Sequence, residues 1–264
     1  MDTSVLDEIV ENKKVEIRKA QSLVPLSEMM ARCKGLERDV RDFNGSIMSG
    51  KRLGVIAEIK FASPSSGSIA NQDDAIRIAR AYGECDAVRA ISVVTDAKYF
   101  GGSLGLLGEV RGIVKVPLLR KDFIIHKYQI YESYLAGADA VLLIASALES
   151  KTLKELAQLA GSFGMQCLVE AHNIEEVEKA VSAGAIMIGI NSRDLGTFTI
   201  DKSLFQSLVQ YIPDEVTKIA ESGIENGSDA RMVCDAGADA ILVGTSLLKA
   251  ADLAEKVNEL AVER

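Results

Sequence analysis

Residues 137–144 read Gly-Ala-Asp-Ala-Val-Leu-Leu-Ile, a glycine that leads into a short apolar run. Variants of this stretch return at 184–190 (Gly-Ala-Ile-Met-Ile-Gly-Ile) and at 237–244 (Gly-Ala-Asp-Ala-Ile-Leu-Val-Gly). Each copy is typical of a helix that ends on glycine and is followed by a buried strand. Two more strand patterns, at 166–170 and 217–221, lie midway between the copies. The repeating unit therefore has the size of one strand–helix pair.

Three earlier strand patterns, at 54–60, 88–94 and 116–121, bring the number of expected strands to eight. Helical patterns lie between the strands, among them 75–82, 129–135, 152–163, 174–182, 202–211 and 229–236. Strict alternation of strand and helix predicts parallel strands with right-handed crossovers. We therefore predict an α/β fold, a (β/α)8 TIM barrel. An open doubly wound sheet is the alternative, but no GxGxxG motif follows the first strand.

Residues 1–50 lie outside this rhythm. Leu6, Ile9 and Val10 predict an amphipathic helix, and the segment through Phe43 is expected to pack on the barrel. The predicted organisation is a single domain, with a helical extension at 1–50 and a catalytic barrel at 51–264. Removing the extension is expected to leave a folded barrel with weakened substrate binding.

Composition restricts the kinds of partner. The net charge of −8 is spread along the chain, which argues against a nucleic-acid-binding surface. Hydrophobic residues make up 48% of the chain, yet no apolar run reaches membrane length and the N-terminus lacks a signal sequence. The four cysteines form no closely spaced pair, which argues against a zinc site or a disulfide framework. We expect a cytoplasmic protein that contacts neither membrane nor nucleic acid.

Polar side chains stand where the expected strands end, although such ends should be apolar or form turns. They are Glu58, Lys60, Lys121, Glu170, Asn191, Arg193, Glu221 and Ser222. A single residue of this kind is most simply a solvated loop residue or half of a structural ion pair. Five strand ends of this kind in one barrel are harder to explain in that way, because charges are rarely buried without a partner. They predict a site at the C-terminal mouth of the barrel, where barrel enzymes carry their catalytic residues.

Two glycine-containing turns indicate that the substrate carries a phosphate. Ser222-Gly223 follows the seventh strand, and Gly244-Thr245-Ser246 follows the eighth. Barrels repeatedly bind phosphate at these two ends through backbone N–H groups and the start of a short helix. Either turn alone would be explained equally well by tight chain reversal.

No metal site is expected. His126 and His172 are the only histidines, and neither has a second histidine or a cysteine at ligand spacing. Both are most simply loop residues, although His172 stands two positions beyond Glu170.

The motifs resemble those of the indole-3-glycerol phosphate synthase family, over nearly the whole chain. The stretches that carry the resemblance are IAEIK (56–60), ASPS (62–65), SVVTD (92–96), FGGS (100–103), PLLRKDFI (117–124), LVEAH (168–172), IGINSRDL (188–195) and AESGI (220–224). The family also has an N-terminal extension of about this length. The chain departs from the family where Phe61 replaces a basic residue, Ser66 a lysine and Gly101 an asparagine. Its last turn reads Gly-Thr-Ser where an acidic or small residue often follows the glycine.

The resemblance implies a carboxy-lyase of tryptophan biosynthesis that acts on 1-(2-carboxyphenylamino)-1-deoxy-D-ribulose 5-phosphate. The substrate closes its ring, then loses carbon dioxide and water, with no cofactor or metal. The implied acid is Lys121, the implied partner Glu170, and Glu58 holds or relays protons. Further implied catalytic residues are Lys60, Asn191 and Ser222. Implied substrate-binding residues are Ser63, Phe100, Phe123, Arg193, Leu195, Glu221, Gly223, Leu242, Gly244 and Thr245.

Two alternatives remain open at this stage. One is another sugar-phosphate barrel enzyme such as phosphoribosylanthranilate isomerase, which needs a Cys–Asp pair, and the first strand has no cysteine. The other is a barrel that binds sugar phosphates without catalysis, which would need no matched acid and base. The expected partner is a small phosphorylated substrate. We expect a monomer or weak homo-oligomer, with contacts to other tryptophan-pathway enzymes.

Overall fold

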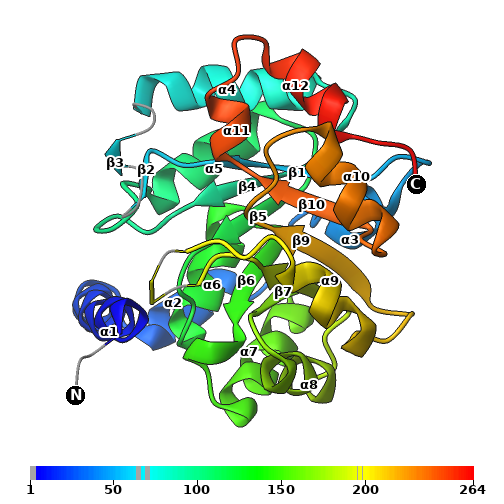
Figure 1. The fold of residues 1–264 in the computed structure, drawn as a ribbon. Coiled ribbons are helices and arrows are strands. Elements are labelled where there is room, and N and C mark those ends of the chain that lie inside the picture. Colours follow the sequence, from blue (N-terminus) through cyan, green and yellow to red (C-terminus); the bar gives the residue numbers. More distant parts are fainter. Residues whose placement is uncertain (1–3, 64–66, 69–71, 195, 198) are drawn as a thin grey trace.

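Eight parallel strands close into a barrel in the computed structural model, which describes residues 4–63, 67–68, 72–194, 196–197 and 199–264 (Figure 1). Around the barrel the order is β1-β10-β9-β8-β7-β6-β5-β4. The strands are β1 (Gly54–Ile59), β4 (Val88–Val94), β5 (Leu118–Lys121), β6 (Ala140–Ile144), β7 (Gln166–Ala171), β8 (Met187–Asn191), β9 (Thr217–Glu221) and β10 (Ala240–Val243). The predicted (β/α)8 barrel is confirmed, and the open sheet is excluded.

Nearly every strand position is buried, because side chains alternate between the barrel interior and the surrounding helices. The interior cluster includes Ile56, Ala90, Leu119, Leu142, Leu168, Met187, Ile219 and Leu242. The intervening strand residues pack outward against helices in a second, larger cluster. A buried barrel of this kind holds the strand ends in fixed positions at one rim.

Helices follow the strands on the outside of the barrel (Figure 1). They are α4 (Gln72–Glu84), α5 (Leu104–Ile113), α6 (Lys127–Ala136), α7 (Ser150–Ser162), α8 (Ile174–Ser182), α9 (Leu204–Leu208), α10 (Gly227–Asp235), α11 (Thr245–Leu248) and α12 (Leu253–Leu260), with short 3-10 turns at Ala145–Ala147 and Val209–Tyr211. In the loop after β1, the short strands β2 (Ala62–Ser63) and β3 (Gly67–Ser68) pair antiparallel. None of the described helices is long and apolar enough to cross a membrane.

The helix α5 was not among the predicted ranges. It contains Gly105, Gly108 and Gly112, each of which costs roughly 1 kcal/mol in a helix relative to alanine. The helix forms because the Ser103 hydroxyl caps its first turn and because it buries Leu106, Leu107 and Val110 against the barrel. Tertiary packing therefore outweighs local propensity here.

Two of the three copies of the repeated stretch contain the motif Gly-Ala-Asp, which has a structural role there. Gly137 and Gly237 end helices with φ angles of 95° and 107°, which favour glycine. Asp139 then accepts a hydrogen bond from the backbone N–H of Leu118, and Asp239 accepts one from the N–H of Lys218, each at 2.9 Å. In these copies the aspartate ties the start of one strand to the strand before it.

The first 50 residues reach both ends of the barrel. The helix α1 (Val5–Leu23) lies beside the carboxyl ends of the strands, where the Tyr99 hydroxyl donates to Glu8 at 3.1 Å. After α2 (Leu26–Cys33), which packs on α6, the helix α3 (Phe43–Met48) lies at the amino ends. Phe43 and Ile47 are fully buried there in the barrel interior cluster. The segment therefore contacts the rim at the carboxyl ends of the strands, and it fills the barrel interior at their amino ends.

Candidate active site

A cavity of about 470 Å³ opens at the carboxyl ends of the strands, and it is lined by most of the predicted site residues. All six predicted catalytic residues line it: Glu58, Lys60, Lys121, Glu170, Asn191 and Ser222. Eight predicted binding residues line it too: Phe100, Phe123, Arg193, Glu221, Gly223, Leu242, Gly244 and Thr245. Of the others, Leu195 lies outside the described residues, as does the Ser66 departure, and for Ser63 only the backbone strand is described.

Lys121 lies at the centre of the polar part of this cavity. Its ammonium is 3.0 Å from Glu170 Oε2 and 3.4 Å from Glu221 Oε2, and both carboxylates are 1% exposed. Burial alone would lower the pKa of Lys121, but the charges of Glu170, Glu221 and Glu58 outweigh it and raise that pKa. Lys121 therefore carries its proton at neutral pH and has one to give.

The pKa values of Glu170, near the end of β7, and of Glu221, at the end of β9, are shifted in opposite directions. Burial alone would raise the pKa of Glu170, but Lys121 and then His172 lower it to about 2. For Glu221, burial raises the pKa, Lys121 opposes the rise only in part, and the charge of Glu170 adds to it, so that the pKa reaches about 8. The two carboxyl groups that flank the Lys121 ammonium therefore have environments that favour opposite protonation states.

Glu58 and Lys60 form a second pair on β1 and the residue after it. The Lys60 ammonium is 2.7 Å from Glu58 Oε1, as expected for side chains two positions apart on one strand face. Glu58 is 4% exposed, and burial would raise its pKa, yet Lys60 and Lys121 lower that pKa. Cations and carboxylates therefore lie next to each other along this rim.

Ser222 and Asn191 are hydrogen-bonded to each other across β8 and β9. The Ser222 hydroxyl donates to Asn191 Oδ1 at 2.8 Å, and the Arg193 N–H donates to the same oxygen at 3.1 Å. Ser222 has a φ of 63°, the only positive φ of a non-glycine residue in the described chain. Such a conformation costs of order 1–3 kcal/mol and is typical of functional sites.

His172, two positions beyond Glu170 in the chain, lies close to the Glu170 carboxylate in the structure. Its Nε2 is 3.6 Å from Glu170 Oε1, and its Nδ1 is 3.3 Å from Glu176 Oε2. Burial would lower the pKa of His172, but the hydrogen bond with Glu176 and the charges of Glu170 and Glu176 raise it. His172 is thus held by ion pairs, whereas His126 caps the start of α6 by accepting from the Tyr128 N–H at 3.1 Å.

The two glycine-containing turns meet at one side of the cavity. Gly223 has a φ of 77°, and a Cβ at Gly244 would lie 2.6 Å from Glu58 Oε1. The short helix α11 begins at Thr245, directly after the second turn. Ser246 and Lys249 also line the cavity here, and the sequence reasoning did not include them among the site residues. Lys249 lies one helical turn beyond Thr245, a spacing that could have indicated it.

The opposite side of the cavity is apolar. The rings of Phe100 and Phe123 have centroids 6.0 Å apart, and Leu142 and Ile144 line the wall beside them. Asp96 and Asp122, two buried carboxylates that are not among the predicted site residues, line the same side. Their residue types gave a signal, since each follows a strand end, but nothing in the sequence indicates what neutralises them.

Two departures from the family pattern lie against each other. Phe61 is buried, and a Cβ at Gly101 would lie 3.4 Å from the Cβ of Phe61. Gly101 also has a φ of 68°, which favours glycine. An apolar ring and a residue without a side chain therefore stand together at this part of the rim.

Among the residues that the structure describes, no group of three histidine, cysteine or acidic side chains could hold a metal ion.

The full sequence is similar to known proteins. The family model described as "Indole-3-glycerol phosphate synthase" matches residues 6–260. The chain belongs to this family. A relative named indole-3-glycerol phosphate synthase from Acetivibrio thermocellus is 40% identical over 257 residues, covering 97% of this chain and 98% of the relative. One of the same name from Mycobacterium avium is 41% identical over 260 residues, covering 97% and 93%.

Solved structures outside the family share the barrel. A 3-hexulose-6-phosphate synthase superposes with a TM-score of 0.63 at 17% identity, covering 79% of this chain and 97% of that one. The orotidine 5'-phosphate decarboxylase from Pyrococcus horikoshii OT3 gives 0.60 at 12% identity, covering 78% and 96%. These similarities concern the fold alone. Membership of the indole-3-glycerol phosphate synthase family rests on the sequence match.

Proposed function

We propose that this chain is a carboxy-lyase that converts 1-(2-carboxyphenylamino)-1-deoxy-D-ribulose 5-phosphate into indole-3-glycerol phosphate in tryptophan biosynthesis. The family match over residues 6–260 supports the activity. The single structural observation that carries it is Lys121, whose charged ammonium lies between two buried carboxyl groups inside the cavity. That arrangement supplies an acid and a base at one place.

Ring closure needs an acid. The aromatic carbon that bears the carboxylate attacks the sugar ketone, and Lys121 donates its proton to the ketone oxygen as charge develops there. The arylamine nitrogen becomes positive in this step. It then accepts the electron pair of the breaking bond to the carboxyl group as carbon dioxide leaves. Because the substrate contains its own electron sink, the decarboxylation calls for no metal or cofactor.

Dehydration needs a second acid–base step. The hydroxyl group that was the ketone takes up a proton relayed by Glu58 and leaves as water, while a proton leaves the neighbouring carbon next to the nitrogen. Glu170 takes this proton, because its low pKa keeps it ionised beside Lys121. Glu58, 2.7 Å from Lys60, holds or relays protons at the same rim. Glu221 supports the network around Lys121.

Binding uses the two sides of the cavity. The turns at Gly223 and Gly244-Thr245 hold the phosphate. Phe100, Phe123 and Leu242 wall the aromatic ring. Lys60 and Arg193 supply positive charge for the substrate carboxylate or phosphate, and Asn191 with Ser222 orients the hydroxyl groups.

The proposal also covers the location, the oligomeric state and the partners of the enzyme. The protein acts in the cytoplasm as a monomer or weak homo-oligomer and contacts other enzymes of the tryptophan pathway. They follow from the proposed role of the enzyme in biosynthesis and from its net charge of −8. Gel filtration and co-purification of the full chain test them.

One assay separates this function from its alternatives. The purified chain is incubated with the carboxyphenylamino substrate, and the fluorescence of the indole product is followed. Formation of indole-3-glycerol phosphate is expected, with the same rate in the presence of EDTA. A barrel that only binds the substrate would give saturable binding without product, and an isomerase would turn over phosphoribosylanthranilate instead.

A further inference from the structure

Two buried carboxylates stand in the apolar side of the cavity, where the mechanism above gives them no task. Asp96 follows β4 and is 0% exposed, and Asp122 follows Lys121 on β5 and is 4% exposed. Both line the cavity. The proposed substrate carries a carboxylate and a phosphate, so two uncompensated negative charges in this wall would oppose its binding.

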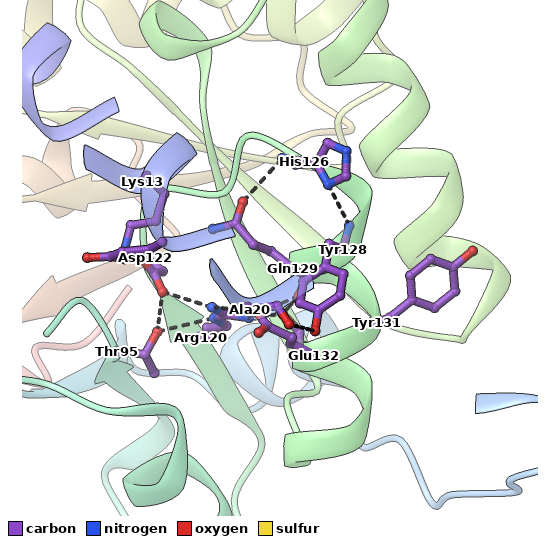
Figure 2. A network of polar contacts seen from close by, with 12 residues as sticks. Lys13, Ala20, Thr95, Arg120, Asp122, His126, Tyr128, Gln129, Tyr131 and Glu132 are labelled. Atoms are coloured by element: carbon purple, nitrogen blue, oxygen red, sulfur yellow. Dashed lines mark hydrogen bonds and ion pairs between the residues drawn. The ribbon is translucent and has the colours of Figure 1, made fainter. Parts of the chain in front are cut away.

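A cation from the N-terminal extension compensates them. The Lys13 ammonium on α1 is 2.8 Å from Asp96 Oδ2 and 3.0 Å from Asp122 Oδ1. A third partner, Glu16 Oε2, lies at 2.8 Å. Lys13 is 4% exposed, and Figure 2 shows it directed at Asp122 from α1. Burial alone would lower its pKa, but Asp122 and Asp96 raise it, so Lys13 is charged.

Asp122 joins Lys13 to the strand that carries Lys121. Its Oδ2 accepts from the Thr95 hydroxyl at 2.7 Å and from Arg120 Nη2 at 2.9 Å (Figure 2). Its Oδ1, which faces Lys13, also accepts from the Phe123 N–H at 2.8 Å. The orientation of this carboxylate therefore fixes the backbone that leads from Lys121 into Phe123.

Asp96 has the same role on the neighbouring loop. Its Oδ1 accepts from the Tyr99 N–H at 2.8 Å, directly before Phe100. The Phe100 and Phe123 rings that wall the cavity thus stand on two loops, each tied to an aspartate that pairs with Lys13. On α1, Ile9 packs in the same apolar cluster as Phe123, which seats the helix beside these loops.

We propose that Lys13 is a positioning residue for substrate binding: it neutralises Asp96 and Asp122 and so holds the loops of Phe100 and Phe123 around the aromatic ring. This inference rests on the proposed function. Removing the cation leaves buried carboxylates partly unpaired, which is costly. They then repel an anionic substrate or turn away from the backbone groups that they fix. The chemistry at Lys121 and Glu170 is affected less than binding.

The test uses the full chain with Lys13→Met, which keeps the length of the side chain and removes its charge. We expect the KM for the carboxyphenylamino substrate to rise about tenfold or more, while kcat changes by less than about threefold. Inhibition by inorganic phosphate should be unchanged, because the glycine turns lie on the other side of the cavity. The matched control is Lys14→Met, whose partner Glu11 is 2.6 Å away on the exposed face of α1. It should behave as wild type.

A second variant keeps the proposal testable if Lys13→Met folds poorly. Lys13→Met combined with Asp96→Asn removes one cation and one anion, so the KM should return to within about threefold of wild type. Inactive wild-type enzyme would contradict the proposed function itself. An active wild type with an unchanged KM in Lys13→Met, or a double variant as impaired in KM as the single one, would overturn the role of Lys13.

Discussion

Lys121 and Lys60 both line the cavity, yet their ammonium groups have different surroundings. Lys121 lies between Glu170 and Glu221, whereas the ion-pair partner of Lys60 among the described residues is Glu58, at 2.7 Å. A group that acts mainly where charge develops on the ketone oxygen stabilises the transition state more than the bound substrate. A cation that holds a substrate anion stabilises both. The two lysines should therefore separate kinetically.

Lys121→Ala should lower kcat by about 10²–10⁴-fold and leave KM within about threefold of wild type, whereas Lys60→Ala should raise KM at least as much as it lowers kcat. Steady-state kinetics with the carboxyphenylamino substrate measure both. The sharper variant is Lys121→Arg, which keeps the charge but, with a pKa above about 12, does not readily give up a proton. Near wild-type turnover in Lys121→Arg would make Lys121 an electrostatic clamp and move the acid to Lys60 or Glu170.

Gly244 tests the phosphate side of the cavity. A Cβ there would lie 2.6 Å from Glu58 Oε1, so Gly244→Asp places a second carboxylate beside Glu58 in the turn before α11. Phosphate inhibition of the wild type should be competitive, and in Gly244→Asp both KM and the phosphate inhibition constant should rise about tenfold or more. The control is Gly161→Asp on α7, where a Cβ meets nothing within 4 Å. An unchanged KM in Gly244→Asp, with a bound anion found elsewhere, would exclude this phosphate site.

At the scale of elements, the first 50 residues divide into parts with different roles. The helix α1 touches the loops at the mouth, where the Tyr128 hydroxyl also donates to the carbonyl of Val24 at 3.0 Å. The helix α3 instead closes the floor with Phe43 and Ile47, both fully buried. The expectation that the whole extension can be removed from a folded barrel therefore needs to be refined element by element.

A chain that begins at Pro25 should remain folded and bind substrate about tenfold or more weakly, because it lacks Lys13 and Ile9. A chain that begins at Lys51 should be strongly destabilised, since loss of a buried phenylalanine alone costs about 3–5 kcal/mol. Urea unfolding and steady-state kinetics on both truncated chains test this. Wild-type KM in the first, or equal stability of the two, would contradict the division.

For the whole molecule, Glu221 makes stability depend on pH. Its pKa in the folded protein is raised, chiefly by burial, to about 8, whereas an exposed glutamate has a pKa near 4.3. Between these values the folded state holds more protons than the unfolded state. The contribution of Glu221 is therefore full below about pH 4 and is lost as pH rises through about 8. Ionised Glu170, with its lowered pKa, adds little slope in this range.

Glu221→Gln keeps the shape of the protonated group and cannot ionise. Its free energy of unfolding should match that of wild type near pH 4 and exceed it by a few kcal/mol above pH 8, at about 1.4 kcal/mol per pKa unit. Chemical denaturation of both proteins at several pH values measures the difference. A difference that does not change with pH would mean that Glu221 is ionised in the folded protein.

The amino-acid sequence was sufficient to predict the barrel and most of the residues around its mouth. The repeated glycine-led stretches indicated the period of the fold. Strands that are buried on both faces read as short apolar runs, and these runs recur along the chain at a regular spacing. Strand-end residues such as Glu170 and Asn191 were predicted to meet because carboxyl ends of parallel strands share one rim. The glycine-rich helix α5 was missed, since local propensity opposed it.

The pairing of the charges could not be predicted from the sequence, because it depends on the folded barrel. Lys13 reaches Asp96 and Asp122 from a helix far away in sequence, and no local pattern encodes that approach. Likewise, Glu170 and Glu221 are the same residue type at similar strand ends, yet their pKa values shift in opposite directions. The reason is physical: burial and Coulomb energy depend on distances between atoms of different segments, and those distances exist only once the barrel has closed.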